Sequence, residues 1–227
     1  HYPNLENPEP QYLFLYDLLK NSGAHIVCLS DRIEKEFVNR GCDSTNVSIL
    51  PCGIDVDLYS IDEDDVLYPD RSVVVGKIEP RKRQAFLQHK GLCIDFIGNN
   101  SDINFDVSDP CYFGEQSKQD IMDNLTSYAN MVLLSSGEAH PFVCLEGMAA
   151  GLGLVLSEQS TANLDLNKPF ITVIPDDKLN DTDYLRDRIK ENREISIPLR
   201  KEIRQYCFEN FDWCVIMNKY KEIIEKI

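Results

Sequence analysis

The sequence predicts an α/β protein in which helices cover both faces of a parallel sheet. Apolar segments of strand length alternate with segments of helix length over most of the chain, which is the pattern of a parallel α/β sheet. The 227 residues are 43% hydrophobic, which is enough to bury a core. Cap and turn residues separate the segments, so that most boundaries can be placed.

The first predicted elements form a short strand–helix–strand series. Residues 25–30 (HIVCLS) are expected to form a strand. Ser30 and Asp31 then supply cap-type side chains for a helix that is predicted to end at Gly41. The next strand is expected at 47–50 (VSIL).

The alternation is then interrupted. Pro51 and Gly53 break the pattern, and the acidic loop IDEDDVLYPD follows. We therefore expect a boundary between two structural units in this region.

A second, longer series begins at Ser72. Strands are predicted at 72–76, 92–98, 131–136, 153–157 and 170–175, and helices at 81–90, 117–129 and 142–150. Ser117 is expected to cap the helix that it opens. From Thr182 the chain is predicted to be helical to its end, with breaks near Pro198 and the sequence FENFDW.

Composition excludes several classes of function. The net charge of −15 argues against general binding to nucleic acids or anionic membranes, because both are held by surplus Lys and Arg. No apolar run reaches the roughly 18 residues that a membrane span needs. The 8 cysteines are scattered without paired spacing, which indicates neither a zinc site nor a disulfide framework. Thiols within predicted strands favour a reducing, cytoplasmic location.

One segment runs against the acidic balance. Residues 76–90 (GKIEPRKRQAFLQHK) hold several Lys and Arg and a single acid, Glu79. A positive island in an acidic protein is a candidate anion site, and a solvated helix face explains the charge equally well.

Two predicted loops meet at the carboxyl ends of strands, where open parallel sheets bind ligands. In the first, the strand ends at Gly76, and Lys77 and Lys82 follow. In the second, LLSSGEAHP leads to Pro141, where a helix is expected to begin. The first backbone amides of that helix are candidate phosphate donors, and the two loops could share one anion.

Two carboxylates, Glu138 and Glu146, flank this predicted helix start. If the helix forms, Glu146 lies about one turn, roughly 5 to 6 Å, from the first amides. Carboxylates repel phosphate but accept hydrogen bonds from adjacent hydroxyls, which points to a diphosphate flanked by polyhydroxyl groups, such as a nucleotide sugar. Taken alone, the two acids are better explained as surface residues.

Four ordered segments carry a family resemblance. EAHPFVCLEGMAAGL resembles the Glu-x7-Glu donor-site motif of the retaining family 4 glycosyltransferases, which have the GT-B fold. VVVGKIEPRKRQAF resembles the family's V-G-R-x-x-x-x-K motif, NVSILPCGIDVDLY its interdomain hinge, and YFGEQSKQDIMDNLTSYANMVLLSS its F-x-G-x6-L-x3-Y-x2-A-D segment. The resemblance extends from about His25 to the C-terminus.

The resemblance implies roles for matching residues. Glu138 would bind hydroxyls of the transferred sugar and Glu146 the ribose hydroxyls, while Lys82 would bind the diphosphate. Phe142 and Val143 would offer backbone amides to the phosphates. The implied donor-binding set is Gly76, Lys77, Lys82, Gly114, Glu138, His140, Phe142, Val143 and Glu146, of which Glu138, Lys77 and Lys82 are the implied catalytic residues.

The match departs from the family pattern at several positions. Lys77 stands where the family has Arg, which keeps the charge but loses the bidentate fork. Pro141 stands where Gly is common and cannot donate an N–H. His140 replaces a common aromatic, and Cys52 replaces an Asn of the hinge.

The resemblance implies a retaining glycosyltransferase that transfers a hexosyl or similar group from a nucleotide sugar, such as a UDP- or GDP-sugar. The acceptor is an unknown glycan, lipid or small molecule. The implied transfer is metal-independent and needs no further cofactor. The alternative is a nucleotide-sugar-binding module or pseudoenzyme. The resemblance implies a Rossmann-like donor-binding domain at 56–212, a remnant of the acceptor-side domain and the hinge at 1–55, and a crossing helix at 213–227. We expect either a longer natural protein or a shortened relative, and an exposed partial domain would favour self-association.

Overall fold

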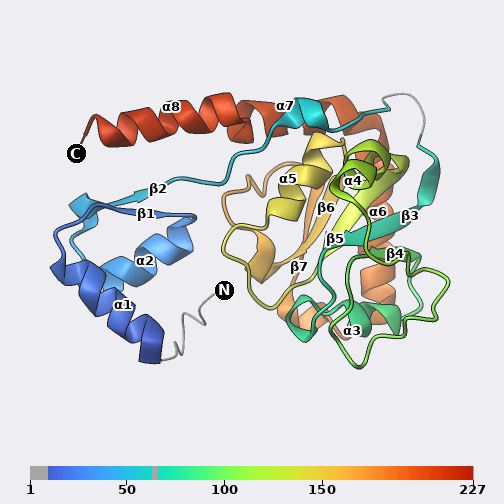
Figure 1. Cartoon of the computed structure of the whole chain (residues 1–227). Coiled ribbons are helices and arrows are strands. Elements are labelled where there is room, and N and C mark those ends of the chain that lie inside the picture. Colours follow the sequence, from blue (N-terminus) through green and yellow to red (C-terminus); the bar gives the residue numbers. More distant parts are fainter. Residues whose placement is uncertain (1–9, 63–65, 227) are drawn as a thin grey trace.

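The chain forms two α/β units of unequal size, joined by a linker, with a C-terminal helix that extends back toward the smaller unit (Figure 1). The computed structural model describes residues 10–62 and 66–226. All the strand pairs in these residues are parallel. The predicted fold class, a parallel sheet with helices around it and a partial second unit, is therefore confirmed.

The smaller unit contains two strands and two helices around a small core. Its elements are α1 (Pro10–Asn21), β1 (Ile26–Cys28), α2 (Asp31–Asn39) and β2 (Val47–Ile49), with a 3₁₀ turn at Ser44–Asn46. Tyr16 of α1 packs edge-on against Phe37 of α2, with ring centroids 4.7 Å apart. Gly41, with φ of 92°, follows α2 in the left-handed region as the sequence predicts.

The start of α2 differs in one detail from the prediction. Ser30 occupies the N-cap position but forms no capping hydrogen bond through its side chain. Its backbone carbonyl instead accepts the amide of Glu34 at 3.0 Å. Helix α2 is thus held at this end by the backbone and by its first-turn acids, Asp31 and Glu34, which suit the positive end of the helix dipole.

The larger unit is built on a five-stranded sheet in the order β4-β3-β5-β6-β7. The strands are β3 (Tyr68–Val75), β4 (Ile94–Ile97), β5 (Tyr128–Leu133), β6 (Gly153–Ser157) and β7 (Ile171–Ile174). Both β3 and β5 begin earlier than predicted. Tyr68 pairs in register with Tyr128, and their rings lie 5.3 Å apart, so cross-strand contact extends both strands into polar sequence.

Six α-helices lie within described residues 66–226, and the last of them, α8, extends away from this sheet toward the smaller unit (Figure 1). They are α3 (Gln84–Gln88), α4 (Lys118–Asn124), α5 (Phe142–Ala149), α6 (Thr182–Ser196), α7 (Arg200–Phe211) and α8 (Trp213–Ile224). The prediction of one helix over 81–90 is wrong. Arg83 adopts a left-handed conformation (φ 58°) that separates a 3₁₀ turn at Pro80–Lys82 from α3. None of the helices between residues 10 and 62 or 66 and 226 is suited to crossing a membrane.

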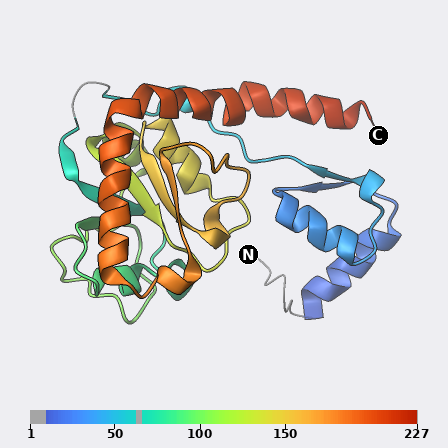
Figure 2. The same cartoon turned by 180° about the vertical axis from the view of Figure 1, so that it is seen from behind.

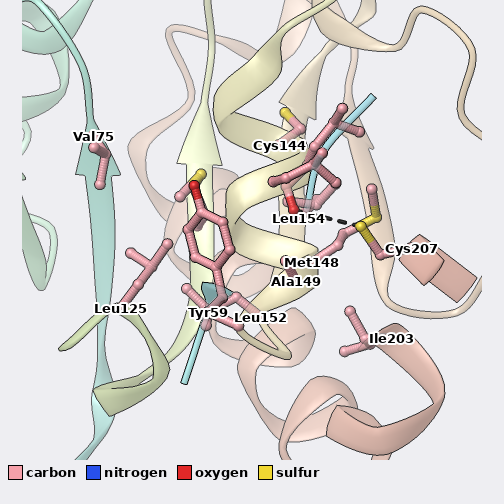
Figure 3. Packing of buried hydrophobic residues seen from close by; sticks show 14 of the residues in the cluster. Tyr59, Val75, Leu125, Cys144, Met148, Ala149, Leu152, Leu154, Ile203 and Cys207 are labelled. Atoms are coloured by element: carbon pink, nitrogen blue, oxygen red, sulfur yellow. Dashed lines mark hydrogen bonds between the residues drawn. The ribbon is translucent and has the colours of Figure 1, made fainter. Parts of the chain in front are cut away.

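The sheet of the larger unit is covered on both faces. Successive residues of β3 point to opposite sides, because Val73 and Val75 join one buried cluster while Val74 joins the other. Helices α5 and α7 cover the first face, where Cys207 donates its thiol hydrogen to the Leu145 carbonyl at 3.5 Å (Figure 3). Helices α3 and α6 cover the second face, which Figure 2 shows from the side of α6.

The linker, residues 50–59, follows β2 and crosses to the larger unit. Ile54 pairs with the junction of α7 and α8: its amide donates to the Phe211 carbonyl at 2.9 Å, and its carbonyl accepts the Trp213 amide at 3.0 Å. Gly53 is required here, since a Cβ at this position would lie 2.6 Å from the Trp213 ring. The linker is therefore fixed to the C-terminal helices by its backbone.

Candidate functional site

The candidate site lies where the chain reverses direction across the sheet. The chain passes from β3 to its neighbour β4 on one side and then to β5 on the other side of β3. Loops that leave β3 and β5 therefore diverge at the carboxyl ends of adjacent strands, which is where open α/β sheets bind ligands. The two loops singled out in the sequence, after Gly76 and before Pro141, are these two loops.

A cleft of about 420 Å³ opens beside the end of β3. It is lined by Val75, Gly76, Lys77, Ile97, Gly98, Asn99, Glu115, Gln116 and Ile121. Two glycines allow the strand ends to approach each other: a Cβ on Gly98 would lie 2.0 Å from the Gly76 carbonyl oxygen. Gly76 and Lys77 of the predicted set therefore border this cleft directly.

The loops after β3 and β5 are joined by hydrogen bonds. The Ser136 amide donates to the Arg81 carbonyl at 2.8 Å. Nη1 of Arg81 lies 3.0 Å from Oε1 of Glu138, and it also donates to the Gly137 carbonyl. Its other nitrogen, Nη2, pairs with Glu79 at 2.7 Å. The structure thus brings a residue of the positive island, Arg81, into direct contact with the first acid of the Glu-x7-Glu motif.

Arg81 is a site residue that the sequence analysis did not select. It was visible only as one member of the positive island. Its side chain ties Glu138 to the loop after β3, and the Glu138 side chain is only 13% exposed. An ion pair that is partly shielded from water fixes the carboxylate more firmly than a surface pair does.

Lys82 places its ammonium beside Gly76, since a Cβ there would lie 3.0 Å from Lys82 Nζ. Burial raises the pKa of Glu146, and the Tyr59 hydroxyl, Lys118 and Lys82 each oppose that shift. Lys82 therefore acts electrostatically on Glu146 while its ammonium lies beside Gly76, which lines the cleft. Lys77 is exposed at the cleft wall.

Helix α5 begins at the predicted place. Pro141 holds the N-cap position. The Cys144 amide, the third of the first backbone amides that were predicted as phosphate donors, instead donates to the Pro141 carbonyl at 3.0 Å. The amides of Phe142 and Val143 come earlier in the first turn, where helix geometry provides no intrahelical acceptor. The helix start therefore offers two amides, rather than three, to a ligand.

Glu146 lies on α5 and is held by a residue of the linker. Oη of Tyr59 donates to Oε1 of Glu146 at 2.8 Å. Glu146 remains partly exposed, whereas Tyr59 is only 3% exposed. In the sequence, Tyr59 stands out only as the last residue of the segment that resembles the hinge, and its contact with Glu146 could not be foreseen because the partners are 87 residues apart.

His140 is buried between the two loops and the linker. Its Nδ1 accepts the Cys52 amide at 2.9 Å, and its ring lies 5.8 Å from that of Phe211. Burial lowers the pKa of His140 to about 4, so the imidazole is neutral and carries its proton on Nε2. Within the described part of the chain, Nε2 is buried without a hydrogen-bond partner. His140 Nε2 is thus an unused donor two residues after Glu138 in the sequence.

The last predicted residue, Gly114, lies on the loop between β4 and α4. With φ of 71°, it turns the chain so that its carbonyl accepts the Gly98 amide at 2.8 Å. The following residues, Glu115 and Gln116, reach the cleft. Ser117 caps α4 as predicted, in a reciprocal capping box with Asp120. Over residues 10–62 and 66–226, no three His, Cys, Asp or Glu side chains gather closely enough to hold a metal ion.

Comparison with known proteins establishes the fold. No protein-family model and no curated protein matches the sequence. Among solved structures, Anabaena HepE in complex with UDP and glucose matches with a TM-score of 0.75 at 14% identity, over 98% of this chain and 69% of that chain. Sucrose-phosphate synthase from Thermosynechococcus elongatus matches with a TM-score of 0.74 at 15% identity, over 98% of this chain and 63% of that chain.

A third solved structure, of WaaG, a glycosyltransferase involved in lipopolysaccharide biosynthesis, matches with a TM-score of 0.70 at 14% identity, over 95% of this chain and 68% of that chain. The chain thus shares the GT-B fold of these glycosyltransferases and spans about two thirds of their length. Identities this low establish the fold alone, and function depends on the geometry of the site.

Proposed function

We propose that this protein binds a nucleotide sugar at the carboxyl ends of β3 and β5 and transfers the sugar to an acceptor with retention of anomeric configuration, as the family 4 resemblance implies. The observation that carries the proposal is the meeting of the two loops. The loop after β3 carries cations, the segment after β5 carries Glu138, the first turn of α5 and Glu146, and the two are joined by hydrogen bonds beside the chain reversal of the sheet. HepE was solved with UDP and with UDP-glucose, which favours UDP as the first nucleotide to test.

The diphosphate is assigned to the positive side of the site. Lys82 lies against Gly76, Lys77 stands at the cleft wall, and the Phe142 and Val143 amides point from the positive end of α5. Oriented N–H groups and ammonium groups stabilise the charge that develops on a leaving diphosphate, without a metal ion. Nε2 of His140 is a further candidate donor to the ligand.

The two carboxylates are assigned to hydroxyl groups. Glu146, held by Tyr59 and partly exposed, is assigned to the ribose, and Glu138 to the transferred sugar. Carboxylates suit adjacent hydroxyls because each can accept several hydrogen bonds. The nucleotide base is assigned to the loop that contains Gly114, which leads into the cleft.

Binding without transfer is the second candidate. The ion pair between Glu138 and Arg81 favours it, because a carboxylate already held by a guanidinium has less capacity for sugar hydroxyls. A donor such as UDP-glucose with an unknown glycan, lipid or small-molecule acceptor is the proposed substrate pair, and a cytoplasmic location is part of the same proposal.

Isothermal titration of the purified chain with UDP, UDP-glucose, GDP and ADP tests the site. We expect at least one diphosphate to bind, and Lys82→Ala to weaken it about 10-fold or more, since the ammonium contacts a charged group. Lys90→Ala, in the same positive island but at the far end of α3, is the matched control and is expected to bind as the wild type does. Failure of every nucleotide to bind the wild type refutes the proposal, and binding without release or transfer of sugar favours the second candidate.

A further inference from the structure

Tyr59 lies outside the two loops and helix α5 that form the candidate site, yet it contacts one of the two acids. It follows the 3₁₀ turn at Val56–Leu58, within the linker, and belongs to the buried cluster on the α5 face of the sheet (Figure 3). Its ring is buried while its hydroxyl reaches Oε1 of Glu146 at 2.8 Å. A residue between the two units thus contributes to the proposed nucleotide site.

The backbone of Tyr59 is fixed independently of this contact. Nη1 of Arg204 donates to the Tyr59 carbonyl at 2.8 Å and to the Ala149 carbonyl, at the end of α5, at 2.6 Å. The next residue, Ser60, donates its amide to the Met122 carbonyl at 3.0 Å. Arg204 therefore ties the linker to the same helix that carries Glu146, and the Tyr59 hydroxyl has a fixed position relative to that carboxylate.

A fixed phenol hydroxyl has a defined effect on a carboxylate. It occupies one acceptor position on Oε1 and so restricts rotation of the carboxyl group, which leaves Oε2 for other donors. A carboxylate that must receive two adjacent hydroxyls gains affinity when its orientation is already set, because less freedom is lost on binding.

We propose that Tyr59 is a positioning residue of the nucleotide site, whose hydroxyl holds the Glu146 carboxylate in the orientation that accepts the two ribose hydroxyls. This inference rests on the proposed function, since it assigns Glu146 to the ribose. Tyr59 itself touches no ligand in this account and acts through Glu146.

The hydrogen bond from Tyr59 also affects the pKa of Glu146. Burial raises the pKa of Glu146, and the Tyr59 hydrogen bond is the first of the interactions that lower it. The other groups that face Glu146 are Lys118 from α4, Lys82 from the loop after β3, and the Cys144 thiol from α5 itself. Removing the hydroxyl while these remain raises the pKa of Glu146, so the acid becomes neutral at a higher pH.

The test compares UDP with 2′,3′-dideoxy-UDP, which lacks the ribose hydroxyls, on the full chain and on Tyr59→Phe. The affinity for UDP divided by the affinity for dideoxy-UDP measures the contribution of the ribose hydroxyls. Titration of the phosphates affects both ligands alike and cancels in this ratio. We expect Tyr59→Phe to reduce the ratio of UDP affinity to dideoxy-UDP affinity about 3- to 10-fold, less than the loss of a whole hydrogen bond to a charged group, because the Glu146 carboxylate itself remains. The pH at which the ratio falls on acidification is expected to move upward in the variant.

Tyr128→Phe is the matched control. The Tyr128 hydroxyl donates to the buried carboxylate of Asp95 at 2.9 Å, so the change removes the same kind of bond outside the site. We expect it to lower stability and to leave the UDP to dideoxy-UDP ratio and its pH profile unchanged. In a Glu146→Ala background, Tyr59→Phe is expected to have no further effect on the ratio.

The outcomes separate the two proposals. If UDP, GDP and ADP all fail to bind the wild type, the proposed function is refuted, and this inference with it. If UDP binds the wild type and Tyr59→Phe keeps the same ratio and pH profile, or if Tyr128→Phe shifts them equally, only the role of Tyr59 is refuted. For GDP or ADP as the bound nucleotide, the corresponding dideoxy analogue gives the same comparison.

Discussion

Replacement of Gly98 by Ala is expected to destabilise the larger unit and to deform the candidate site together. Gly98 ends β4 with φ of 149°, a conformation that side chains rarely adopt. An added Cβ would lie 2.0 Å from the Gly76 carbonyl oxygen and 2.6 Å from its carbonyl carbon. Both neighbours are backbone atoms of the adjacent strand end, so no rotation of a side chain relieves the overlap.

The expected loss of stability in Gly98→Ala has two contributions. Forcing a residue other than glycine into a sparsely populated backbone region costs about 1–3 kcal/mol. Overpacking against atoms that cannot move aside adds about 1–3 kcal/mol. We therefore expect Gly98→Ala to lower the free energy of unfolding by about 2–6 kcal/mol, measured by urea denaturation at equilibrium. Because the same contact shapes the cleft wall, nucleotide affinity should fall as well.

Gly91→Ala separates the two contributions. Gly91, in the loop before β4, also has a positive φ of 61°, but a Cβ there would have nothing within 4 Å. It should show only the backbone term, about 1–2 kcal/mol, with unchanged nucleotide affinity. Equal destabilisation by the two substitutions would refute the steric reasoning, and full stability of Gly98→Ala would refute the close approach of β3 and β4.

Three further predictions concern acids and a buried cation. Glu146→Gln is expected to weaken bare UDP several-fold, whereas Glu138→Gln should reduce only the additional affinity for UDP-glucose; equal loss of UDP binding in both would contradict the assigned roles. Because burial raises the pKa of Glu146 above its unfolded value, the folded state is favoured at acid pH, and this contribution is lost as pH rises through the raised pKa. Melting curves should therefore show that Glu146→Gln raises the melting temperature, relative to the wild type, more at pH 7 than at pH 4. Arg200 is buried and donates to the carbonyls of Thr126 at 2.6 Å and Tyr128 at 3.0 Å, so Arg200→Met should destabilise by about 3 kcal/mol or more in urea denaturation, with nucleotide affinity per folded molecule unchanged.

Much of the fold could be predicted from sequence because its determinants are local. β6 at Gly153–Ser157 and the capping of α4 by Ser117 agree with the predictions, since apolar runs and cap residues act over a few positions. The predicted helix over 81–90 failed for an equally local reason that composition hides. Arg83 in a left-handed conformation ends one turn and starts another, and nothing in its side chain signals that backbone state.

The site was only partly predictable because its supporting contacts are distant in sequence. The sequence located the segments that carry Lys82, Glu138 and Glu146, since those segments follow strands. It could not locate the partners of these residues. Arg81 and Glu138 are 57 residues apart, and Tyr59 and Glu146 are 87 apart. Such pairs depend on how the sheet brings separate loops together, and no spacing rule specifies them.

The linker, residues 50–59, contacts the segment that contains the Glu-x7-Glu motif at two points. Cys52, near its start, donates to His140, and Tyr59, at its end, donates to Glu146. Both acceptors belong to the segment that contains the Glu-x7-Glu motif, and between the two contacts Ile54 is paired with the α7–α8 junction. A substitution in the linker therefore acts on the candidate site through fixed hydrogen bonds rather than through contact with ligand. Changes there should alter nucleotide affinity while every residue that the motif itself specifies stays in place.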